Sequence, residues 1–344
     1  MNILITGGCG FIGCNAAQRF LQLGHSVTVV DNLSRRGSDR NREWLKTQGA
    51  FEFVAADIRD AELLDKIVRR GGFDVVLHLA AQVAVTTSVV EPREDFEINA
   101  LGTFNVLEAV RKYSPRSIVL NASTNKVYGK LVGPKVEEDA MRCKLPGLPM
   151  GVAETQPLDF HSPYGCSKGA GDQYVIDYAR IFGLRTLNFR QSCIYGYRQF
   201  GVEDQGWVAW FTIAHASNRP VVIYGSGKQV RDILFIDDLI DCYLAAIERI
   251  DNVAGTTFNV GGGPENTLSL LELLAALKAH SGRQVIHSFE DWRPGDQPVY
   301  ISDIRKAGEL LAWQPRISVE LGLERLHEWV TANAELLSAS SVTA

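Results

Sequence analysis

The sequence predicts an α/β protein with a Rossmann-type doubly wound parallel sheet and a smaller mixed α/β lobe at its C-terminal end. Short, almost continuously apolar runs alternate with helical patterns over the first half of the chain, and a glycine-rich turn follows the first run. Such strands, separated by helices, are typical of a parallel sheet that is covered on both faces. We therefore expect a nucleotide-binding domain over residues 1–185, to which some later segments return, and a substrate-binding lobe over residues 186–338.

The elements are expected in a regular order. Apolar runs predict strands at 2–8, 26–31, 51–57, 74–81, 117–123 and 185–196, with shorter ones at 220–225, 256–262 and 284–289. Helical patterns are found at 11–23, 61–70, 95–113, 162–183, 204–216, 237–249, 268–281 and 319–334. Ser162 is a candidate N-cap, with Pro163 as the first helical residue. The stretch 130–160 is rich in Gly, Pro and charge and predicts a long loop.

The composition excludes several classes of protein. The chain has 344 residues and a net charge of −5, which gives no electrostatic case for binding nucleic acid. No apolar window is long enough to cross a membrane, and the N-terminus enters a strand without a basic leader, so we expect a cytoplasmic protein. The six cysteines form no C-x-x-C pair, which favours reduced thiols and predicts no metal site.

The glycine-rich turn TGGCGFIG predicts a dinucleotide site. Gly7, Gly10 and Gly13 lie between the first strand and the first helix. Glycine there lets the backbone approach a pyrophosphate, and the helix N-terminus supplies free N–H groups. A tight strand–helix turn that binds no ligand would use similar residues. The residues at the ends of the neighbouring strands therefore distinguish a dinucleotide site from a turn without a ligand.

Acidic residues end the next two strands. Asp31 closes the second strand at about the separation expected of an acid that binds the adenosine ribose, and it favours NAD over NADP. Arg35 and Arg36 follow closely and are the groups that a 2′-phosphate would use. Asp57 and Ile58 end the third strand, where the adenine often lies, although Asp57 is an equally good N-cap for the following helix.

Two residues of the predicted 162–183 helix carry candidate chemistry. Tyr164 and Lys168 are four residues apart and therefore lie on one face, one turn from each other. A phenol has an ordinary pKa of about 10 and is a poor base at neutral pH, but a nearby ammonium favours its phenolate form. An ordinary surface pair has the same spacing. The strand-end hydroxyls of Ser123 and Thr124, together with the glycine turn, favour the catalytic interpretation.

Together the motifs resemble those of the extended short-chain dehydrogenases/reductases, the NAD-dependent epimerase/dehydratase family. The resemblance covers nearly the whole chain and is carried by TGGCGFIG, Asp31, Asp57, HLAA, INALGT, STNKVYG, SPYGCSKG and YGSGKQVRDILFIDDL. It implies NAD as cofactor, Tyr164 as acid/base and Thr124 as the residue that hydrogen-bonds the reacting hydroxyl. Lys168 would lower the pKa of the phenol and bind the nicotinamide ribose, and Ser123 would lie nearer the nicotinamide.

The same resemblance implies two sets of binding residues. The residues expected to contact NAD are Gly7, Gly10, Phe11, Ile12, Gly13, Asp31, Asn32, Ser34, Arg35, Asp57, Ile58, Leu79, Ala80, Ala81, Gln82, Asn99, Ser123, Tyr164 and Lys168. The residues expected to contact the substrate are Thr124, Asn125, Lys126, Gln191, Arg198, Gln199, Gln205, Tyr224, Arg231, Arg293 and Asp296.

Within the family, the residues after Thr124 narrow the reaction. Members act mostly on nucleotide-linked sugars, and a 4,6-dehydratase normally carries an Asp-Glu pair at the positions of Asn125 and Lys126. Strings such as LDFHSPYGCSKGAGDQY and GSGKQVRDILF are instead similar to those of enzymes that invert C2 of a CDP-linked 3,6-dideoxyhexose for lipopolysaccharide O-antigen. The resemblance therefore implies a 2-epimerase with a CDP-linked sugar as substrate. The alternatives are a UDP-hexose 4-epimerase and a CDP-glucose 2-epimerase.

Charged residues of the second half have competing interpretations. Arg231 and Arg293 suit a diphosphate, because a guanidinium binds phosphate bidentately, and Asp296 suits a ribose. For Arg231 the structural alternative is a salt bridge with Asp232 or Asp237, and for Arg293 it is a solvated loop charge.

Two histidines and the oligomeric state are also open. His161 is either a second acid/base or a structural residue, and His78, inside a strand, is expected in the core. Relatives usually dimerise through helices equivalent to 95–113 and 163–182, which implies a homodimer or tetramer. A non-catalytic NAD-binding scaffold is the rival of another class, and the presence of both Tyr164 and Lys168 argues against it.

Overall fold

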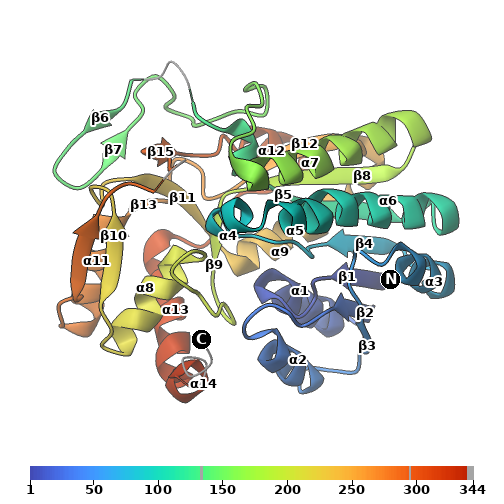
Figure 1. The fold of residues 1–344 in the computed structure, drawn as a ribbon, viewed down its shortest axis with the longest axis horizontal. Coiled ribbons are helices and arrows are strands. Elements are labelled where there is room, and N and C mark those ends of the chain that lie inside the picture. The colour runs from blue at the N-terminus through green and yellow to red at the C-terminus, as the bar shows by residue number, and fades with distance from the viewer. Residues whose placement is uncertain (132–134, 294–295, 339–344) are drawn as a thin grey trace.

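A computed structural model shows how these elements assemble, and it describes residues 1–131, 135–293 and 296–338. A seven-stranded parallel sheet forms the centre of the larger domain (Figure 1). Its strand order is β3 (Glu52–Ala55), β2 (Ser26–Asp31), β1 (Asn2–Thr6), β4 (Val75–His78), β5 (Ile118–Thr124), β8 (Arg185–Gln191) and β12 (Thr256–Val260). The chain winds outward from β1 in both directions, which confirms the predicted doubly wound sheet.

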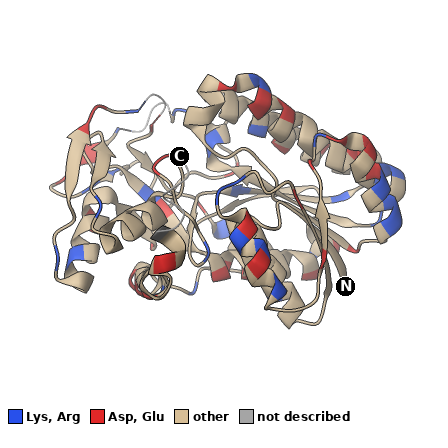
Figure 2. Cartoon of the chain, turned by 60° about the horizontal axis from the view of Figure 1, so that its bottom comes forward, with Lys and Arg blue, Asp and Glu red and all other residues tan. Residues whose placement is uncertain are grey.

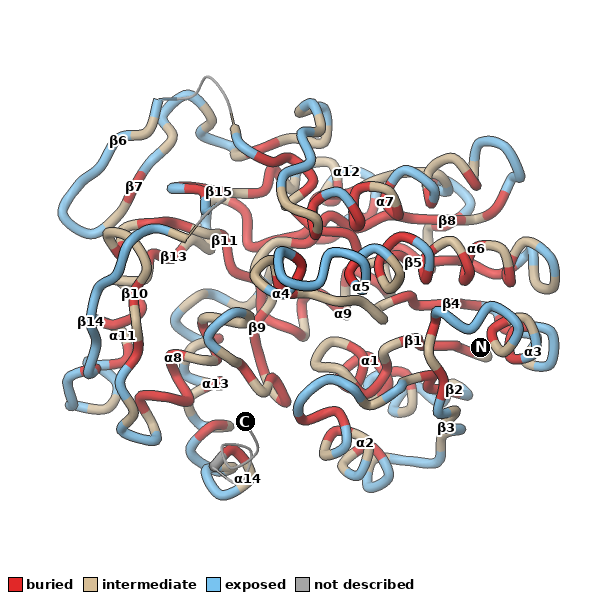
Figure 3. Tube along the Cα trace, in the orientation of Figure 1, coloured by how far each residue is buried: buried red, intermediate tan, exposed pale blue. Residues whose placement is uncertain are grey.

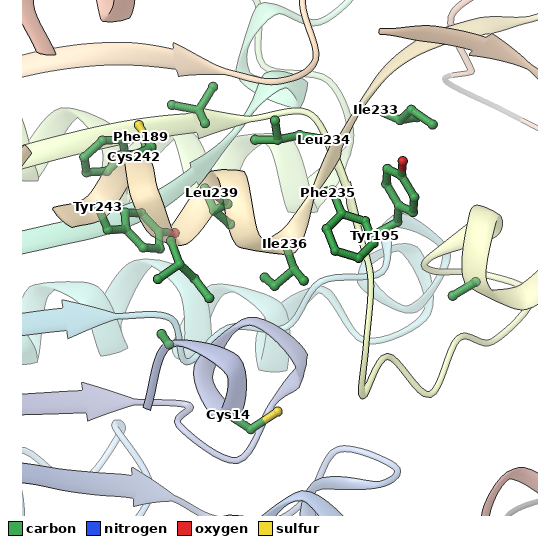
Figure 4. Packing of buried hydrophobic residues seen from close by; sticks show 14 of the residues in the cluster. Cys14, Phe189, Tyr195, Ile233, Leu234, Phe235, Ile236, Leu239, Cys242 and Tyr243 are labelled. Atoms are coloured by element: carbon green, nitrogen blue, oxygen red, sulfur yellow. The ribbon is translucent and has the colours of Figure 1, made fainter. Parts of the chain in front are cut away.

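Helices cover both faces of this sheet, and each face has its own buried apolar cluster. One face carries α3 (Ala61–Gly71), α6 (Gly102–Tyr113) and α7 (Ser162–Phe182). The other carries α1 (Phe11–Gln22), α9 (Ile236–Glu248) and α12 (Arg305–Leu311). Figure 4 shows part of this second cluster, where the rings of Phe189 and Tyr243 pack edge to face with centroids 5.2 Å apart. The inner strands of the main sheet are buried, whereas its edge strand β3 and the outer helix faces are partly exposed (Figure 3).

Segments from the second half of the chain complete this domain. Strand β12, predicted among the irregular elements, pairs in parallel with β8 and forms the edge of the main sheet. Helices α9 and α12 pack beneath it. Short helices α2 (Ser38–Lys46), α4 (Val85–Val90) and α10 (Ile250–Val253) lie in the connections. The chain therefore crosses between the domain and the smaller lobe more than once.

The smaller lobe is built around a mixed four-stranded sheet with β11 (Val230–Phe235) at its centre. This strand pairs antiparallel with β13 (Thr267–Ser269), and in parallel with β15 (Val299–Tyr300) and β9 (Cys193–Tyr195). A separate parallel pair consists of β10 (Val221–Tyr224) and β14 (His287–Glu290). The helices of this lobe are α8 (Trp207–Ala216), α11 (Leu270–Ser281), α13 (Val319–Ala332) and α14 (Ala334–Ser338).

The predicted 130–160 loop contains a short hairpin. Strands β6 (Glu137–Glu138) and β7 (Cys143–Lys144) pair antiparallel within it. Arg142, between the two strands, donates two hydrogen bonds of 2.7 Å to the carboxylate of Glu272 on α11. This bidentate ion pair holds the hairpin against the smaller lobe.

The single helix predicted at 95–113 is interrupted in the structure. Helix α5 (Pro92–Phe96) is followed by a π-helical turn, η1 (Glu97–Leu101), and then by α6. The Thr103 hydroxyl donates a hydrogen bond of 2.6 Å to the carbonyl of Asn99, and back-bonding of this type loosens or bends a helix. The sequence pattern shows only that the segment is helical, whereas the change of pitch is seen only in the structure.

Helix α7 begins at Ser162, one residue earlier than predicted. The Ser162 hydroxyl nevertheless accepts a hydrogen bond of 3.2 Å from the N–H of Gly165, which is the contact expected of a capping serine. Pro163 occupies the first turn, where its missing N–H is not needed.

A buried ion pair joins α7 to the sheet. Arg190 of β8 donates hydrogen bonds of 3.0 and 2.8 Å to the two carboxylate oxygens of Asp172, and the side chains are 5% and 0% exposed. Ser123 of β5 donates to the same carboxylate at 2.7 Å, and the side-chain amide of Asn188 of β8 also donates to it. A buried charge is tolerated only where it is paired and hydrogen-bonded, so this group holds α7, β5 and β8 in one arrangement.

Arg190→Met is expected to lower the free energy of unfolding by about 3–5 kcal/mol, because it leaves the Asp172 carboxylate buried without its partner. Urea denaturation followed by circular dichroism measures the change. Arg180→Met is the matched control, because Arg180 forms an exposed ion pair with Asp177 on the same helix. Such surface pairs contribute about 0–1 kcal/mol. Equal losses in the two variants would show that the burial of the pair is unimportant.

Candidate active site

A cleft of about 540 Å³ lies where the carboxyl ends of the parallel strands face the smaller lobe. Open α/β sheets bind ligands at this edge. Nearly all residues predicted to contact cofactor or substrate line the cleft, and the exceptions are Gln82 and Asn99. The folded chain therefore brings together residues that are spread from Gly7 to Asp296 in the sequence.

The glycine turn packs tightly against neighbouring backbone. Gly7 has a φ of +68°, and a Cβ there would lie 2.6 Å from the backbone nitrogen of Ala80. A Cβ on Gly13 would lie 2.3 Å from the carbonyl oxygen of Gly7. Gly10 is the N-cap of α1, and no side chain of the described residues caps the helix there. The N–H groups of the first turn are consequently available to an anion in the cleft.

Each acid at the strand ends is held by defined partners. Asp31 accepts hydrogen bonds from the N–H groups of Cys9, at 2.9 Å, and Leu33, at 2.7 Å, while burial raises its pKa. Asp57 is bound by Arg59, and this contact lowers its pKa to about 2. The N-cap of α3 is Asp60 rather than Asp57, so the capping alternative for Asp57 is wrong.

Thr124, Tyr164 and Lys168 meet in the middle of the cleft. Thr124 is the last residue of β5, and the other two come from the first turns of α7. The Lys168 ammonium donates to the carbonyl of Ala122 at 2.5 Å, and the side chains of Thr124 and Tyr164 line the same cavity. All three side chains are more than nine-tenths buried. This arrangement places a hydroxyl, a phenol and an ammonium around one position, as proton transfer to a bound hydroxyl requires.

Burial opposes the expected tuning of Tyr164. Desolvation raises the pKa of the phenol to about 12, and the hydrogen bond from Thr124 offsets only part of this effect. Desolvation also lowers the pKa of Lys168 to about 8, although the carboxylates of Asp172 and Asp95 act in the opposite direction. In the chain by itself the pKa of the phenol stays raised, and the lowering expected from Lys168 stays a prediction. The phenolate needs further positive charge in the cleft.

Two acids behind the site were missed in the sequence. Asp172 lies one helical turn after Lys168 and accepts a hydrogen bond from the Ser123 hydroxyl. The Ser123 side chain is therefore turned toward α7. Asp95 is buried and bound by Ser167 at 2.5 Å. The four-residue spacing of Lys168 and Asp172 is a sequence signal for the first acid. The second acid precedes the π-helical turn in a charged stretch and has no comparable signal.

Gln82 and Asn99 support the cleft from behind. The amide of Asn99 accepts from the N–H of Gln82 and donates to its carbonyl, both at 3.0 Å. The side chains of both residues also donate to Asp95, at 2.9 and 3.1 Å. These contacts fix the strand end at 79–82, whereas we expected both residues to touch NAD.

On the substrate side, Arg231 and Lys126 are the available cations. Arg231 donates to the carbonyl of Val230 at 2.8 Å and lies 3.9 Å from Asp296, so the salt-bridge alternatives for Arg231 are wrong. The neighbouring Asp232 is bound by Ser192 instead. Lys126 lies in the single 3₁₀ turn η2 (Asn125–Tyr128) directly after β5, and burial lowers its pKa.

Arg293 is held by acids of the 199–206 loop. Its guanidinium lies 3.1 Å from Glu203 and 3.3 Å from Asp204, and it stacks on the ring of Tyr224 at 3.8 Å. Arg293 is therefore neither a solvated charge nor a free phosphate ligand in the chain alone. On the same loop, Gln205 accepts a hydrogen bond of 2.9 Å from Arg35, which links the smaller lobe to the strand end of β2.

Three other predicted substrate residues differ in what their side chains bind. Arg198 lines the cleft, but its guanidinium donates to the side chain of Asn41 at 3.0 Å and to the carbonyl of Arg40 at 3.1 Å, both on α2. It therefore braces α2 instead of presenting a free cation. Gln191 donates to the Tyr243 hydroxyl. Gln199 keeps a buried carbonyl oxygen that has no partner among the described residues.

Neither histidine considered in the sequence belongs to the cleft lining. His161 is half-exposed, and its Nε2 lies 2.8 Å from a carboxylate oxygen of Asp159. His78 is buried between the hydroxyls of Thr6 and Thr103, and desolvation lowers its pKa to about 3. His78 is thus a neutral core residue, as predicted.

Comparison with known proteins decides the family. The model of the NAD dependent epimerase/dehydratase family matches residues 3–261. The chain belongs to the NAD-dependent epimerase/dehydratase family. It is 45% identical to the CDP-paratose 2-epimerase of Salmonella typhi, over 96% of this chain and 100% of that relative.

Solved structures of family members have the same fold. The UDP-glucose 4-epimerase of Thermotoga maritima, solved with UDP-glucose, has a TM-score of 0.82 and 32% identity, covering 97% of this chain and 99% of the other. The UDP-glucuronic acid 4-epimerase of Bacillus cereus, solved with UDP-glucuronic acid and NAD, has a TM-score of 0.83 and 28% identity, covering 96% and 99%.

NAD is the cofactor of this family, and the residues of the cleft fit it. The tight glycine turn and the uncapped N-terminus of α1 suit a pyrophosphate, while the Asp31 carboxylate suits a ribose and would repel a 2′-phosphate. No helix of the described residues is long and apolar enough to cross a membrane. Basic and acidic residues are interspersed on the same helices (Figure 2).

Gly7→Ala is expected to weaken NAD binding by about tenfold to hundredfold, because the strain and the contact with Ala80 distort the turn. Titration of the protein with NAD, followed by intrinsic fluorescence, measures the loss. Gly24→Ala is the matched control: it has a similar φ of +75°, but its Cβ would meet no atom within 4 Å. Normal NAD affinity in Gly7→Ala would contradict the assignment of the turn.

Proposed function

We propose that this protein inverts C2 of a CDP-linked hexose of the CDP-paratose type, through transient oxidation to a 2-keto sugar. The observation that carries the proposal is the 45% identity with the Salmonella typhi CDP-paratose 2-epimerase over nearly the whole of both chains. The grouping of Thr124, Tyr164 and Lys168 in one cleft supports it.

Other reactions of the family are less well supported. A 4,6-dehydratase needs acids where this chain has Asn125 and Lys126. A UDP-hexose 4-epimerase is the second candidate, because the Thermotoga maritima UDP-glucose 4-epimerase is 32% identical and has the same fold. A CDP-glucose 2-epimerase would use the same residues on a sugar that keeps all its hydroxyls.

Each catalytic residue has one task in the proposed reaction. Tyr164, as phenolate, takes the proton from the C2 hydroxyl and returns it after inversion, while Thr124 hydrogen-bonds the same oxygen. Lys168 is anchored to the Ala122 carbonyl, and its positive charge favours the phenolate. The chemistry that NAD supplies when bound is the acceptance of a hydride and its return. The sugar has to present its other face before that return, so the nucleotide must stay anchored while the hexose turns.

We also propose that the protein forms a homodimer, or a tetramer built from two such dimers, through α5, η1, α6 and α7. The support is a set of apolar side chains on α5, η1 and α7 that are between 39% and 62% exposed, namely Phe96, Leu101, Tyr174, Ile181 and Phe182. Exposed apolar groups gathered on neighbouring helices are typical of an interface. They replace solvent contacts by packing when two copies associate.

For a dimer, sedimentation equilibrium should give the native protein twice the mass of one chain. Ile181→Asp should give the mass of one chain, because a buried unpaired carboxylate disrupts an apolar interface. Leu310→Asp is the control, since Leu310 is also exposed, at 45%, but lies on α12. A native protein that sediments as a monomer would contradict the dimer.

Product analysis tests the reaction itself. In deuterium oxide, the NAD-loaded protein is expected to convert CDP-paratose to its C2 epimer without deuterium at C2, because the hydride stays on the enzyme between the two transfers. NMR of products from a panel of CDP- and UDP-hexoses identifies the nucleobase, the sugar and the inverted carbon in one experiment. Deuterium at C2 would favour deprotonation chemistry, and inversion at C4 would favour the second candidate.

The control for this assay is a pair of tyrosine variants on α7. Tyr164→Phe should lower the turnover by about 10²–10⁴-fold, the usual contribution of a general acid–base group. Tyr174→Phe removes an equivalent hydroxyl from the exposed side of the same helix and should leave turnover unchanged. Near-normal turnover of Tyr164→Phe would show that Tyr164 is not the acid/base group of the reaction.

A further inference from the structure

Lys126 is a cation of the cleft that the proposed catalytic steps do not use. It follows Thr124 by two residues, and its N–H donates to the Thr124 hydroxyl oxygen at 3.2 Å. Its side chain lines the same cavity as Thr124 and Tyr164. In the described part of the chain, the Lys126 ammonium has no hydrogen-bonding or ion-pair partner. A partly buried cation without a partner is costly, so an anionic ligand would stabilise it.

Arg231 lines the same cavity and places a second positive charge near Lys126. The repulsion between the two groups lowers the pKa of Lys126 beyond the effect of its burial. Asp296 is the neighbouring acid, but it lies 3.9 Å from Arg231, which leaves guanidinium donors free. Two cations with one loosely paired acid form a site for a group that carries more than one negative charge.

The chemistry of the substrate places its diphosphate near this site. In a nucleotide sugar the phosphate oxygen is attached to C1, and C2 is bonded directly to C1. When Thr124 and Tyr164 bind the oxygen on C2, the β-phosphate is therefore the neighbouring group, within reach of a long side chain that starts two residues after Thr124. With C4 at the same position, the whole sugar ring would separate the β-phosphate from Lys126.

We propose that Lys126 binds the β-phosphate of the nucleotide sugar together with Arg231, and thereby places C2 rather than C4 against Thr124 and Tyr164. The inference rests on the proposed function and makes Lys126 a specificity-determining residue of the same site. It also explains how the nucleotide stays anchored close to the reacting carbon while the hexose turns.

The test uses nucleotides that differ only in the β-phosphate. Calorimetric titration of the NAD-loaded Lys126→Met protein should show an affinity for CDP reduced by about tenfold to hundredfold, as expected for one lost charge-assisted hydrogen bond. The affinity for CMP, which has no β-phosphate, should stay unchanged. Lys126→Arg keeps the charge and should retain most of the preference for CDP. An equal loss for CDP and CMP, or no loss for either, would overturn the proposal.

A second lysine separates contact from long-range attraction. Lys130 is exposed and outside the cleft lining, so Lys130→Met removes the same charge nearby without removing the contact. Its CDP affinity should equal that of the native protein, and a loss as large as in Lys126→Met would overturn the proposal. If Lys126→Met loses NAD or unfolds, Lys126→Gln provides the same comparison with a polar side chain.

The preference of the native protein for cytidine or uridine nucleotides distinguishes this inference from the proposed function. A native protein that prefers UDP and UMP contradicts the cytidine specificity, and the same comparison of diphosphate with monophosphate then decides the role of Lys126. In turnover, Lys126→Met should raise KM and also lower kcat for inversion at C2, because the contact both binds the phosphate and places C2 against Thr124 and Tyr164. A protein that binds none of the four nucleotides would overturn both proposals.

Discussion

The buried ion pair between Asp172 and Arg190 is the interaction on which the geometry of the cleft depends. The carboxylate binds β8 through Arg190 and β5 through the Ser123 hydroxyl, while it belongs to the helix that carries Tyr164 and Lys168. Charged groups in a buried network are satisfied in few arrangements, so they specify position more than they add stability. The distance between the strand end at Thr124 and the helix face is set in this way.

Burial then determines the ionisation of the catalytic pair. The same desolvation raises the pKa of Tyr164 to about 12 and lowers the pKa of Lys168 to about 8, so at neutral pH the phenol is neutral while Lys168 stays mainly in its ammonium form. Asp172 and Asp95 counteract this for Lys168, because nearby carboxylates favour its ammonium form. The site is therefore prepared for proton transfer but needs positive charge from what binds there. Such conditional tuning suits a reaction that should begin only when cofactor and substrate are in place.

The cationic side chains in the substrate half of the cleft differ in whether an acidic side chain binds them. Arg293 is held between Glu203 and Asp204, whereas Lys126 has no acid bound to it in the described residues. A phosphate that binds Arg293 must compete with two carboxylates, while one that binds Lys126 relieves an unpaired charge. The 199–206 loop, which also contacts Arg35 through Gln205, therefore connects nucleotide binding to the larger domain.

The sequence by itself determined the fold class, the glycine turn and the pairing of Tyr164 with Lys168. Strands buried on both faces must be apolar throughout, and residues four apart in a helix must share a face, so these features need no knowledge of distant contacts. Only the tertiary structure decided that Arg198 braces α2 while Arg231 stays available, and that the 95–113 helix contains a π-helical turn. The partners of Arg198 lie more than 150 residues away along the sequence. No local sequence pattern indicates which of several acids or carbonyls a long cationic side chain will contact.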